Sequence, residues 1–158
     1  MARAALVLIA ILSACGDGGD SMGTCVLDEI VADRTPAGAV DCGSFDLMAP
    51  DSDLQDAMGC MTSAVNTQEG FHVIWDRQGI DSQIRAAYYG TPTDNGYTVF
   101  QLTFDSDPSG GSGSGASSTE FLCTNLQPMQ TCPDIRVSLC FQCTGPGGTA
   151  VCRGGEQI

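Results

Sequence analysis

The chain has 158 residues, and its 19 acidic residues against six arginines, with no lysine, give a formal net charge of −13. A surface with so few cations repels a phosphate backbone, so nucleic acid is excluded as a partner. Hydrophobic residues make up 42% of the chain and charged residues 16%, which is typical of a folded chain, and the length suits one domain.

Residues 1–14 have the organisation of a signal peptide. Arg3 gives a basic start, and the apolar run at residues 4–12 would cover roughly 14 Å as a helix, about half of the hydrocarbon core of a bilayer. The run is therefore predicted to be an export signal rather than a membrane span. It ends in Leu12-Ser13-Ala14-Cys15, where small residues precede a cysteine.

This four-residue sequence resembles the lipobox of bacterial lipoproteins. The resemblance implies cleavage before Cys15, a covalent diacylglyceryl lipid on the Cys15 thiol and acylation of the new amino terminus, which together give stable membrane attachment. Gly16 stands where an aspartate tends to signal retention at the inner membrane, so the resemblance also implies the outer membrane. An ordinary secretory signal with a chance cysteine is the alternative.

Residues 15–24 are predicted to be the lipidated cysteine and a flexible tether, because residues 16–24 are rich in Gly and Asp and offer little to bury. Nine residues reach roughly 30 Å at full extension, so the domain that follows would stay near its bilayer. Removal of Arg3 with the signal peptide would leave five arginines against 19 acidic residues, 5 − 19 = −14. Such a charge disfavours anionic headgroups and favours cationic partners.

Eight cysteines follow the lipidated one: Cys25, Cys42, Cys60, Cys123, Cys132, Cys140, Cys143 and Cys152. An exported chain enters an oxidising compartment, so four structural disulfides are expected. We expect Cys42 to pair with Cys60, Cys25 to join the C-terminal part, and the remaining pairs to be local. The C-x-x-C spacing of Cys140 and Cys143 leaves two alternatives, redox use and a four-thiolate zinc site. The zinc ligands would be Cys132, Cys140, Cys143 and Cys152.

The clearest predicted helix begins after Pro50. Ser52 and Gln55 have the spacing of a capping box, and Gly70 is the predicted stop. Apolar residues at intervals of four, three and four give this helix one buried face. They are Leu54, Met58, Met61 and Val65.

Three strands are predicted next, at residues 71–76, 80–89 and 97–104, because β-branched and aromatic residues are concentrated there. Turn-forming residues separate them, which predicts an antiparallel meander. Alternation along the first strand places His72 on the face opposite Phe71.

Residues 109–118 are a Gly/Ser-rich segment that predicts a flexible loop. The Cys-rich C-terminal part that follows has strand-like residues at 121–122 and 135–141. They are expected to extend the same sheet, and a small disulfide-stapled appendage is the alternative. The predicted fold class is α+β: one amphipathic helix packed on an antiparallel β-sheet meander and stapled by disulfides. It forms a single domain over residues 25–158.

His72 is the only histidine and a candidate general base. A hydrolase would need a nucleophile within about 3 Å of it, and the sequence contains neither a G-x-S-x-G nor an H-E-x-x-H motif. A pair of carboxylates can also catalyse hydrolysis. With 19 acidic residues, however, pairs are expected by chance, so no particular pair is informative. An incidental strand histidine is therefore expected.

Asp105 and Asp107 resemble the start of an EF-hand-like calcium loop, with Gly110 at its sixth position. Ala116 occupies the twelfth position, where a bidentate glutamate belongs. At most weak calcium binding is expected at these two aspartates.

Together these patterns predict a lipid-anchored protein of the cell envelope, located at the outer membrane through the lipid on Cys15. We expect a non-enzymatic binding module for an envelope protein or a small ligand, without catalytic residues. The alternative is an envelope hydrolase that uses carboxylates or His72.

Overall fold

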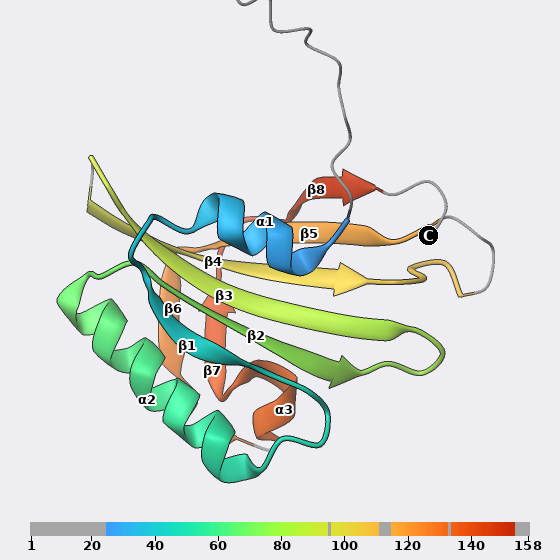
Figure 1. The fold of residues 1–158 in the computed structure, drawn as a ribbon, viewed down its shortest axis with the longest axis horizontal. Helices are drawn as coiled ribbons and strands as arrows, with labels where there is room; N and C mark the ends of the chain where they lie inside the picture. The colour runs from blue at the N-terminus through green and yellow to red at the C-terminus, as the bar shows by residue number, and fades with distance from the viewer. Residues whose placement is uncertain (1–24, 95, 111–114, 133, 154–158) are drawn as a thin grey trace, which may run out of the picture.

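The structure is a computed structural model that describes residues 25–94, 96–110, 115–132 and 134–153. The predicted signal peptide, Cys15 and the tether lie outside the described residues. The helices and strands, shown in Figure 1, are α1 (Leu27–Arg34), β1 (Val40–Phe45), α2 (Asp51–Thr67), β2 (Phe71–Gln78), β3 (Gln83–Thr93), β4 (Gly96–Asp105), β5 (Ser117–Cys123), β6 (Asn125–Pro128), α3 (Ile135–Ser138), β7 (Phe141–Thr144) and β8 (Thr149–Arg153).

Six strands form the main sheet, in the order β1-β2-β3-β4-β5-β8. β1 and β2 are parallel, and α2 connects them, whereas every other neighbouring pair in this sheet is antiparallel. β6 and β7 form a separate antiparallel pair. The α+β prediction is confirmed at this level, with few helices and a mostly antiparallel sheet.

A packed layer covers each face of the sheet. Alternation along β2 sends Phe71, Val73 and Trp75 into the larger core, to which α2, β6 and β7 also contribute. Ile74 points to the opposite face and packs with Leu27 of α1 in a smaller core. In Figure 1, α1 crosses in front of the strands, whereas β6 and β7 lie behind them.

α2 covers the residues of the predicted helix and begins after Pro50, but the predicted capping box and the predicted stop at Gly70 are wrong. Its buried residues are Leu54, Ala57, Met61 and Ala64, whereas Met58 and Val65 of the predicted stripe are only partly buried. The N-cap residue is Pro50, which has no side-chain acceptor, so Ser52 and Gln55 lie inside the helix and form no capping box. At the other end Gln68 takes a left-handed conformation and its N–H bonds back to the last turn. The helix therefore ends before Gly70.

Two predicted strands are corrected. The strand predicted from Ile80 begins at Gln83 as β3, because the residues before it form a turn that holds Ile80 in solvent. The strand predicted at residues 135–141 is replaced at its start by α3, and β7, which begins at Phe141, pairs with β6 instead of extending the main sheet. The side chain of Asp134 accepts a hydrogen bond from the backbone N–H of Arg136 and caps this short helix.

Four elements are new relative to the prediction: α1, β1, β6 and β8. α1 buries Leu27 and Val31 on the face of the sheet that the prediction left uncovered. β1 is an edge strand whose register with β2 shifts around Gly43. β5 begins at Ser117, so it takes in the last two residues of the Gly/Ser-rich segment 109–118.

Four disulfides join the eight cysteines, as predicted. Cys42 of β1 bonds Cys60 of α2, and Cys25 bonds Cys152 of β8. The other two bridges are local, Cys123–Cys143 and Cys132–Cys140. Because Cys140 and Cys143 have different partners, the redox pair and the four-thiolate zinc site are both wrong.

Candidate functional site

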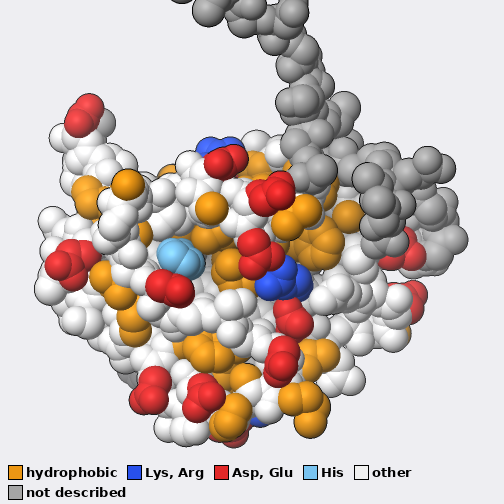
Figure 2. Space-filling view, viewed as in Figure 1, with side chains coloured by type: hydrophobic (Ala, Val, Ile, Leu, Met, Phe, Trp, Pro, Cys, Tyr) orange, Lys and Arg blue, Asp and Glu red, His pale blue; other side chains and the backbone are white. Residues whose placement is uncertain are grey.

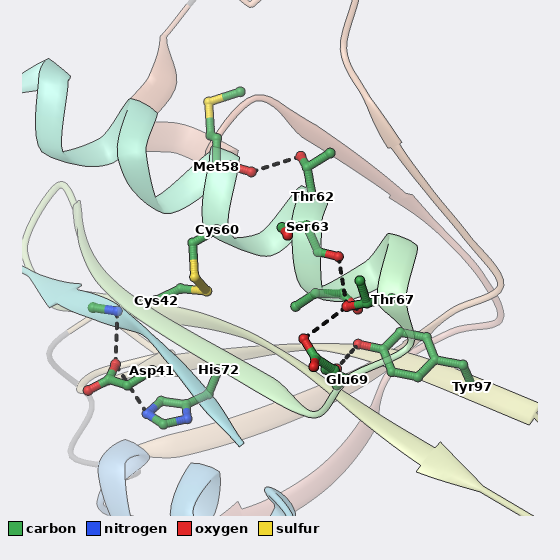
Figure 3. Close-up of a disulfide and its surroundings, with 12 residues drawn as sticks. Asp41, Cys42, Met58, Cys60, Thr62, Ser63, Thr67, Glu69, His72 and Tyr97 are labelled. Carbon is green, nitrogen blue, oxygen red and sulfur yellow. Dashed lines mark hydrogen bonds and ion pairs between the residues drawn. A yellow bond between two sulfur atoms is a disulfide. The ribbon is translucent and has the colours of Figure 1, made fainter. Parts of the chain in front are cut away.

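His72 of β2 lies beside Asp41 of β1 (Figure 3). Its Nε2 is 3.4 Å from Asp41 Oδ1, and its side chain is 28% exposed. The same Asp41 oxygen accepts a hydrogen bond of 2.8 Å from the backbone N–H of Gly43. Gly43 has a φ of +107°, a conformation that favours glycine, so Asp41 holds the irregular part of β1 in place.

The surroundings of His72 do not complete a hydrolytic site. Its Nδ1 is buried and has no hydrogen-bond partner in the part of the chain that the structure describes. The buried Ser118 hydroxyl also lacks a partner there, but β5 is three strands from β2, about 14 Å at the usual strand spacing. The structure thus joins His72 to a carboxylate and leaves that serine far away.

The predicted calcium residues form a turn after β4. Asp105 Oδ1 accepts a hydrogen bond of 2.9 Å from the backbone N–H of Asp107, and the N–H of Gly110 donates to the Asp107 carbonyl. Within the described ranges, no three His, Cys, Asp or Glu side chains are grouped to hold a metal ion. Residues 111–114 of this loop lie outside those ranges, so calcium binding at Asp105 and Asp107 stays a prediction.

One end of the sheet gathers several loops. β1 and β2 both end there, β3 begins there, and the β4–β5 loop follows on the same side because the strands are antiparallel. The start of α1 is fastened to this end, since Arg85 near the beginning of β3 bonds Asp28 in the first turn of α1. We call this region the hairpin end.

The hairpin end contains a surface hollow of about 340 Å³, which we call the hairpin hollow. It is lined by Leu47 of the β1–α2 loop and by residues 76–83 of the β2–β3 hairpin. Ile80 is fully exposed, Leu47 is 44% exposed, and its neighbour Met48 is 86% exposed. Gly79 makes this turn possible, because the Ser82 carbonyl oxygen lies only 2.1 Å from where its Cβ would be.

Charged side chains line the hollow beside Leu47 and Ile80, and they include Asp76, Arg77 and Asp81. Asp46 accepts a hydrogen bond of 2.7 Å from the backbone N–H of Met48, which fixes the loop that presents Leu47. Neither Asp46 nor Asp81 forms an ion pair with a described residue, and neither does Arg77. The exposed side chain of Leu47 therefore lies beside charged side chains that form no ion pair with a described residue.

A second hollow of about 410 Å³ lies between α2 and α3. Its charged groups already bind one another, because Arg136 pairs with Asp51 and donates to the Ala49 carbonyl oxygen at 3.0 Å. The Arg136 carbonyl in turn accepts a hydrogen bond of 2.9 Å from Trp75 Nε1. These contacts join α3 to the core, so the charged groups of this hollow have a structural role in holding α3.

Two polar contacts fasten α1 to the sheet. Arg85 Nε also bonds Asp76 Oδ1 at 2.9 Å, so its guanidinium bridges β2 and α1. The hydrogen bond from Arg85 holds the pKa of Asp28 below its ordinary value, against the opposing effect of partial burial. The first turn of α1 is thereby linked to the sheet by charge as well as by Leu27.

The other end of α1 is near a buried tyrosine. The hydroxyl of Tyr89 donates to Glu120 Oε1, which also lies 3.9 Å from Nε of Arg34. Burial, and then the hydrogen bond to Glu120, raise the pKa of Tyr89 above its ordinary value. The ring of Tyr89 stacks on Phe100 with centroids 5.0 Å apart.

The sequence analysis missed the hairpin hollow. A signal existed, because Leu47 and Met48 lie between Asp46 and Pro50, and Ile80 lies between Gly79 and Asp81. Apolar residues inside turn sequences lack the periodicity that would bury them, so their exposure could have been suspected.

No protein-family model matches the chain, and neither a curated protein nor a solved structure matches it. The fold and site define a disulfide-stapled α+β domain with a mostly antiparallel sheet and a surface hollow at one end, beside which Leu47 and Ile80 are exposed. None of the helices that the structure describes between residues 25 and 153 has the length and apolarity of a membrane span.

Proposed function

We propose that this chain is an exported, lipid-anchored protein of the cell envelope that acts as a non-enzymatic binding module through its hairpin hollow. The observation that carries this proposal is the exposure of Leu47, Met48 and Ile80 around one hollow. Exposed apolar side chains that gather at one place are typical of interaction sites.

Two observations support the location. Four disulfides form and persist in oxidising compartments outside the cytoplasm. The resemblance of residues 12–15 to a lipobox supplies the anchor, with residues 1–14 removed and the lipid on Cys15. With Gly16 next to the lipidated residue, the outer membrane is the proposed site of attachment.

The proposed scaffold is the amphipathic helix α2 on the meander β2–β5, within one domain at residues 25–158. The Cys42–Cys60 bridge fixes α2 to the sheet, and consecutive antiparallel strands hold the β2–β3 turn in a defined place. Such a scaffold presents the loops of the hairpin end without a large loss of conformational entropy on binding.

The location is tested by the intact mass of the membrane-extracted protein, with and without reduction, after thiol alkylation. We expect residues 15–158 plus two or three acyl chains, with alkylation only after reductant is added. A Cys15→Ser variant is the control and should lose the acyl mass. Unlipidated wild-type protein would contradict the proposed anchor.

The binding site is tested by retention of envelope components on the immobilised full chain. Ile80→Ser removes apolar surface at the hairpin hollow. Val40→Ser removes an exposed apolar side chain at the start of β1, at the opposite end of the sheet. We expect retention to be reduced by Ile80→Ser alone, and an equal effect of both variants would contradict the site.

The second candidate is an envelope hydrolase, which the contact between His72 and Asp41 favours. It predicts turnover of an ester, peptide or glycan substrate by the wild type and loss of that turnover in His72→Ala. A carboxylate mechanism predicts turnover that survives His72→Ala. Absence of turnover by the wild type would reject this candidate for those substrates.

The calcium prediction has a direct test. Binding at Asp105 and Asp107 predicts a rise in Tm in millimolar calcium, and Asp107→Ala should abolish that rise. A Tm that calcium does not change would contradict calcium binding at Asp105 and Asp107.

A further inference from the structure

Exposed apolar side chains are concentrated at the hairpin end. Of the six large hydrophobic residues that are exposed among the described residues, three lie in or beside the hairpin hollow: Leu47, Met48 and Ile80. Single exposed apolar residues are ordinary in proteins, whereas a group around one hollow indicates an occupant.

The walls of the hollow are held in place before anything binds. The side chain of Asp46 bonds the N–H of Met48, and its carbonyl accepts the N–H of Ala49 at 3.2 Å. On the other wall, the N–H of Gln83 donates to Ser106 Oγ at 2.8 Å, which ties the base of the β2–β3 turn to the end of β4. A preformed site loses little conformational entropy on binding.

The size of the hollow suits a few side chains. Its volume of about 340 Å³ is near the lower end of the roughly 300–1,000 Å³ range of small-molecule pockets. Its two hydrophobic lining residues come from different loops, Leu47 from the β1–α2 loop and Ile80 from the β2–β3 turn. One apolar side chain of a peptide can enter between them while the rest of the peptide lies on the surface.

Charge selects among the occupants. Asp46 and Asp81 flank the exposed apolar residues and form no ion pair with a described residue. The whole chain has a net charge of −13, and Figure 2 shows acidic side chains spread over the face that carries α1. Anionic headgroups and acidic segments are repelled by such a surface, whereas Lys and Arg are attracted.

We propose that the hairpin hollow binds a basic amphipathic peptide segment, which inserts an apolar side chain between Leu47 and Ile80 and places Lys or Arg against Asp46 and Asp81. This inference deepens the proposed function and rests on its binding site. Arg77, the one arginine that lines the hollow, would donate hydrogen bonds to backbone carbonyl groups of the bound segment.

The test uses the full lipidated chain in detergent micelles and a fluorescein-labelled peptide, Lys-Lys-Leu-Phe-Lys-Lys, with empty micelles as the blank. The matched control peptide is Glu-Glu-Leu-Phe-Glu-Glu. We expect the basic peptide to raise fluorescence anisotropy saturably and the acidic peptide to have no effect. Ile80→Ser should weaken binding about tenfold, because it removes a central apolar contact, whereas Val40→Ser should leave the Kd unchanged.

The charged contribution is tested separately. Asp81→Asn should weaken binding about threefold and reduce its salt dependence, because a rim charge acts mainly through long-range attraction. Ile80 and Asp81 are exposed, so both variants are expected to fold, which circular dichroism checks. Equal binding of the two peptides, or binding that Ile80→Ser does not change, would overturn the inference.

A bilayer is the competing occupant. In phosphatidylcholine vesicles, Ile80→Trp should show no more quenching by brominated acyl chains than the wild type, whose Trp75 is buried. Strong additional quenching would place the hairpin end in the membrane and overturn the peptide proposal. Acylated protein whose capture of envelope components depends on Ile80, yet which does not bind the basic peptide, would reject the partner class and leave the proposed function standing.

Discussion

The two faces of the sheet are covered by different means. The α2 side has a large apolar core with Trp75, Tyr88 and Phe141 in ring contact, and three of the four disulfides join elements of this side. The α1 side has a smaller core and relies on charged contacts and on the Cys25–Cys152 bridge. Disulfides therefore link both sides, but the first side has the larger buried core and the second depends more on charged contacts.

The largest effect is expected on the α2 side. Trp75→Ala should lower the free energy of unfolding by about 3–5 kcal/mol, because a fully buried ring that stacks on Tyr88 is lost. Urea unfolding measures this change. Trp75→Phe is the control, since it keeps a ring and loses the hydrogen bond to the Arg136 carbonyl. A loss below about 1 kcal/mol for the alanine variant would contradict the described core.

The second expected effect concerns the covalent link of the α1 side. Replacing Cys25 and Cys152 together by serine opens a bridge with a sequence separation of 127, against 18 for Cys42–Cys60. In the chain-entropy model, the longer loop gives about 2 kcal/mol more stabilisation. We expect the Tm to fall more when Cys25 and Cys152 are replaced by serine than when Cys42 and Cys60 are. The first double variant should also lose amide protection early in α1. A larger fall in Tm on loss of Cys42–Cys60 would show that packing in the folded state, rather than loop closure, determines how much each disulfide stabilises the protein.

Alkaline pH should destabilise both sides through buried tyrosines. Burial raises the pKa of Tyr88 to about 12, and the pKa of Tyr89 is also raised, whereas an unfolded tyrosine ionises near 10. Below about pH 10 this stability is fully present, and it is lost as pH rises, by up to about 1.4 kcal/mol per pH unit for each tyrosine. Denaturant unfolding between about pH 10 and 12 measures the slope.

Tyr89→Phe separates the two sides in the same experiment. The variant should remove the contribution of one tyrosine from the fall of stability with pH, because the Tyr89 hydroxyl that would ionise is absent. An unchanged slope would assign the whole effect to Tyr88 and Tyr97, whose pKa burial raises to about 12.

The smallest effect is expected at Asp28. Its carboxylate is half exposed, so Asp28→Asn should cost less than about 1 kcal/mol at neutral pH. Because the pKa of Asp28 is lowered in the fold, its contribution is present above the unfolded pKa and is lost as pH falls through the folded pKa. The difference between wild type and variant should therefore vanish in acid, which Tm measured against pH checks.

The sequence carried enough information for the parts with strong local signals. Apolar residues at helical intervals predicted α2. Export predicted four disulfides, and proximity along the chain predicted Cys42–Cys60 and local pairing near the C-terminus. A link from Cys25 to the C-terminal part was expected, but its partner, Cys152, could not be chosen from the sequence.

Tertiary context decided the rest. Residues 135–138 have β-branched residues typical of a strand, yet the Asp134 cap and the hydrogen bond from Trp75 hold them as α3. β1 is interrupted by Gly43 and pairs in parallel, and parallel pairing leaves no turn signal in the sequence. The hairpin hollow was missed because exposure of Leu47 and Ile80 depends on how two separate loops meet.

The link between Asp41 and Gly43 has a consequence for crowding. β1 is an edge strand, and an unpaired edge amide is a template for the strand of another molecule. The Asp41 carboxylate already occupies the N–H of Gly43, and the shifted register bends the edge away from a flat, pairable line. Molecules held side by side on a membrane, as proposed for this chain, would meet one another often, and this edge would let them do so without joining their sheets.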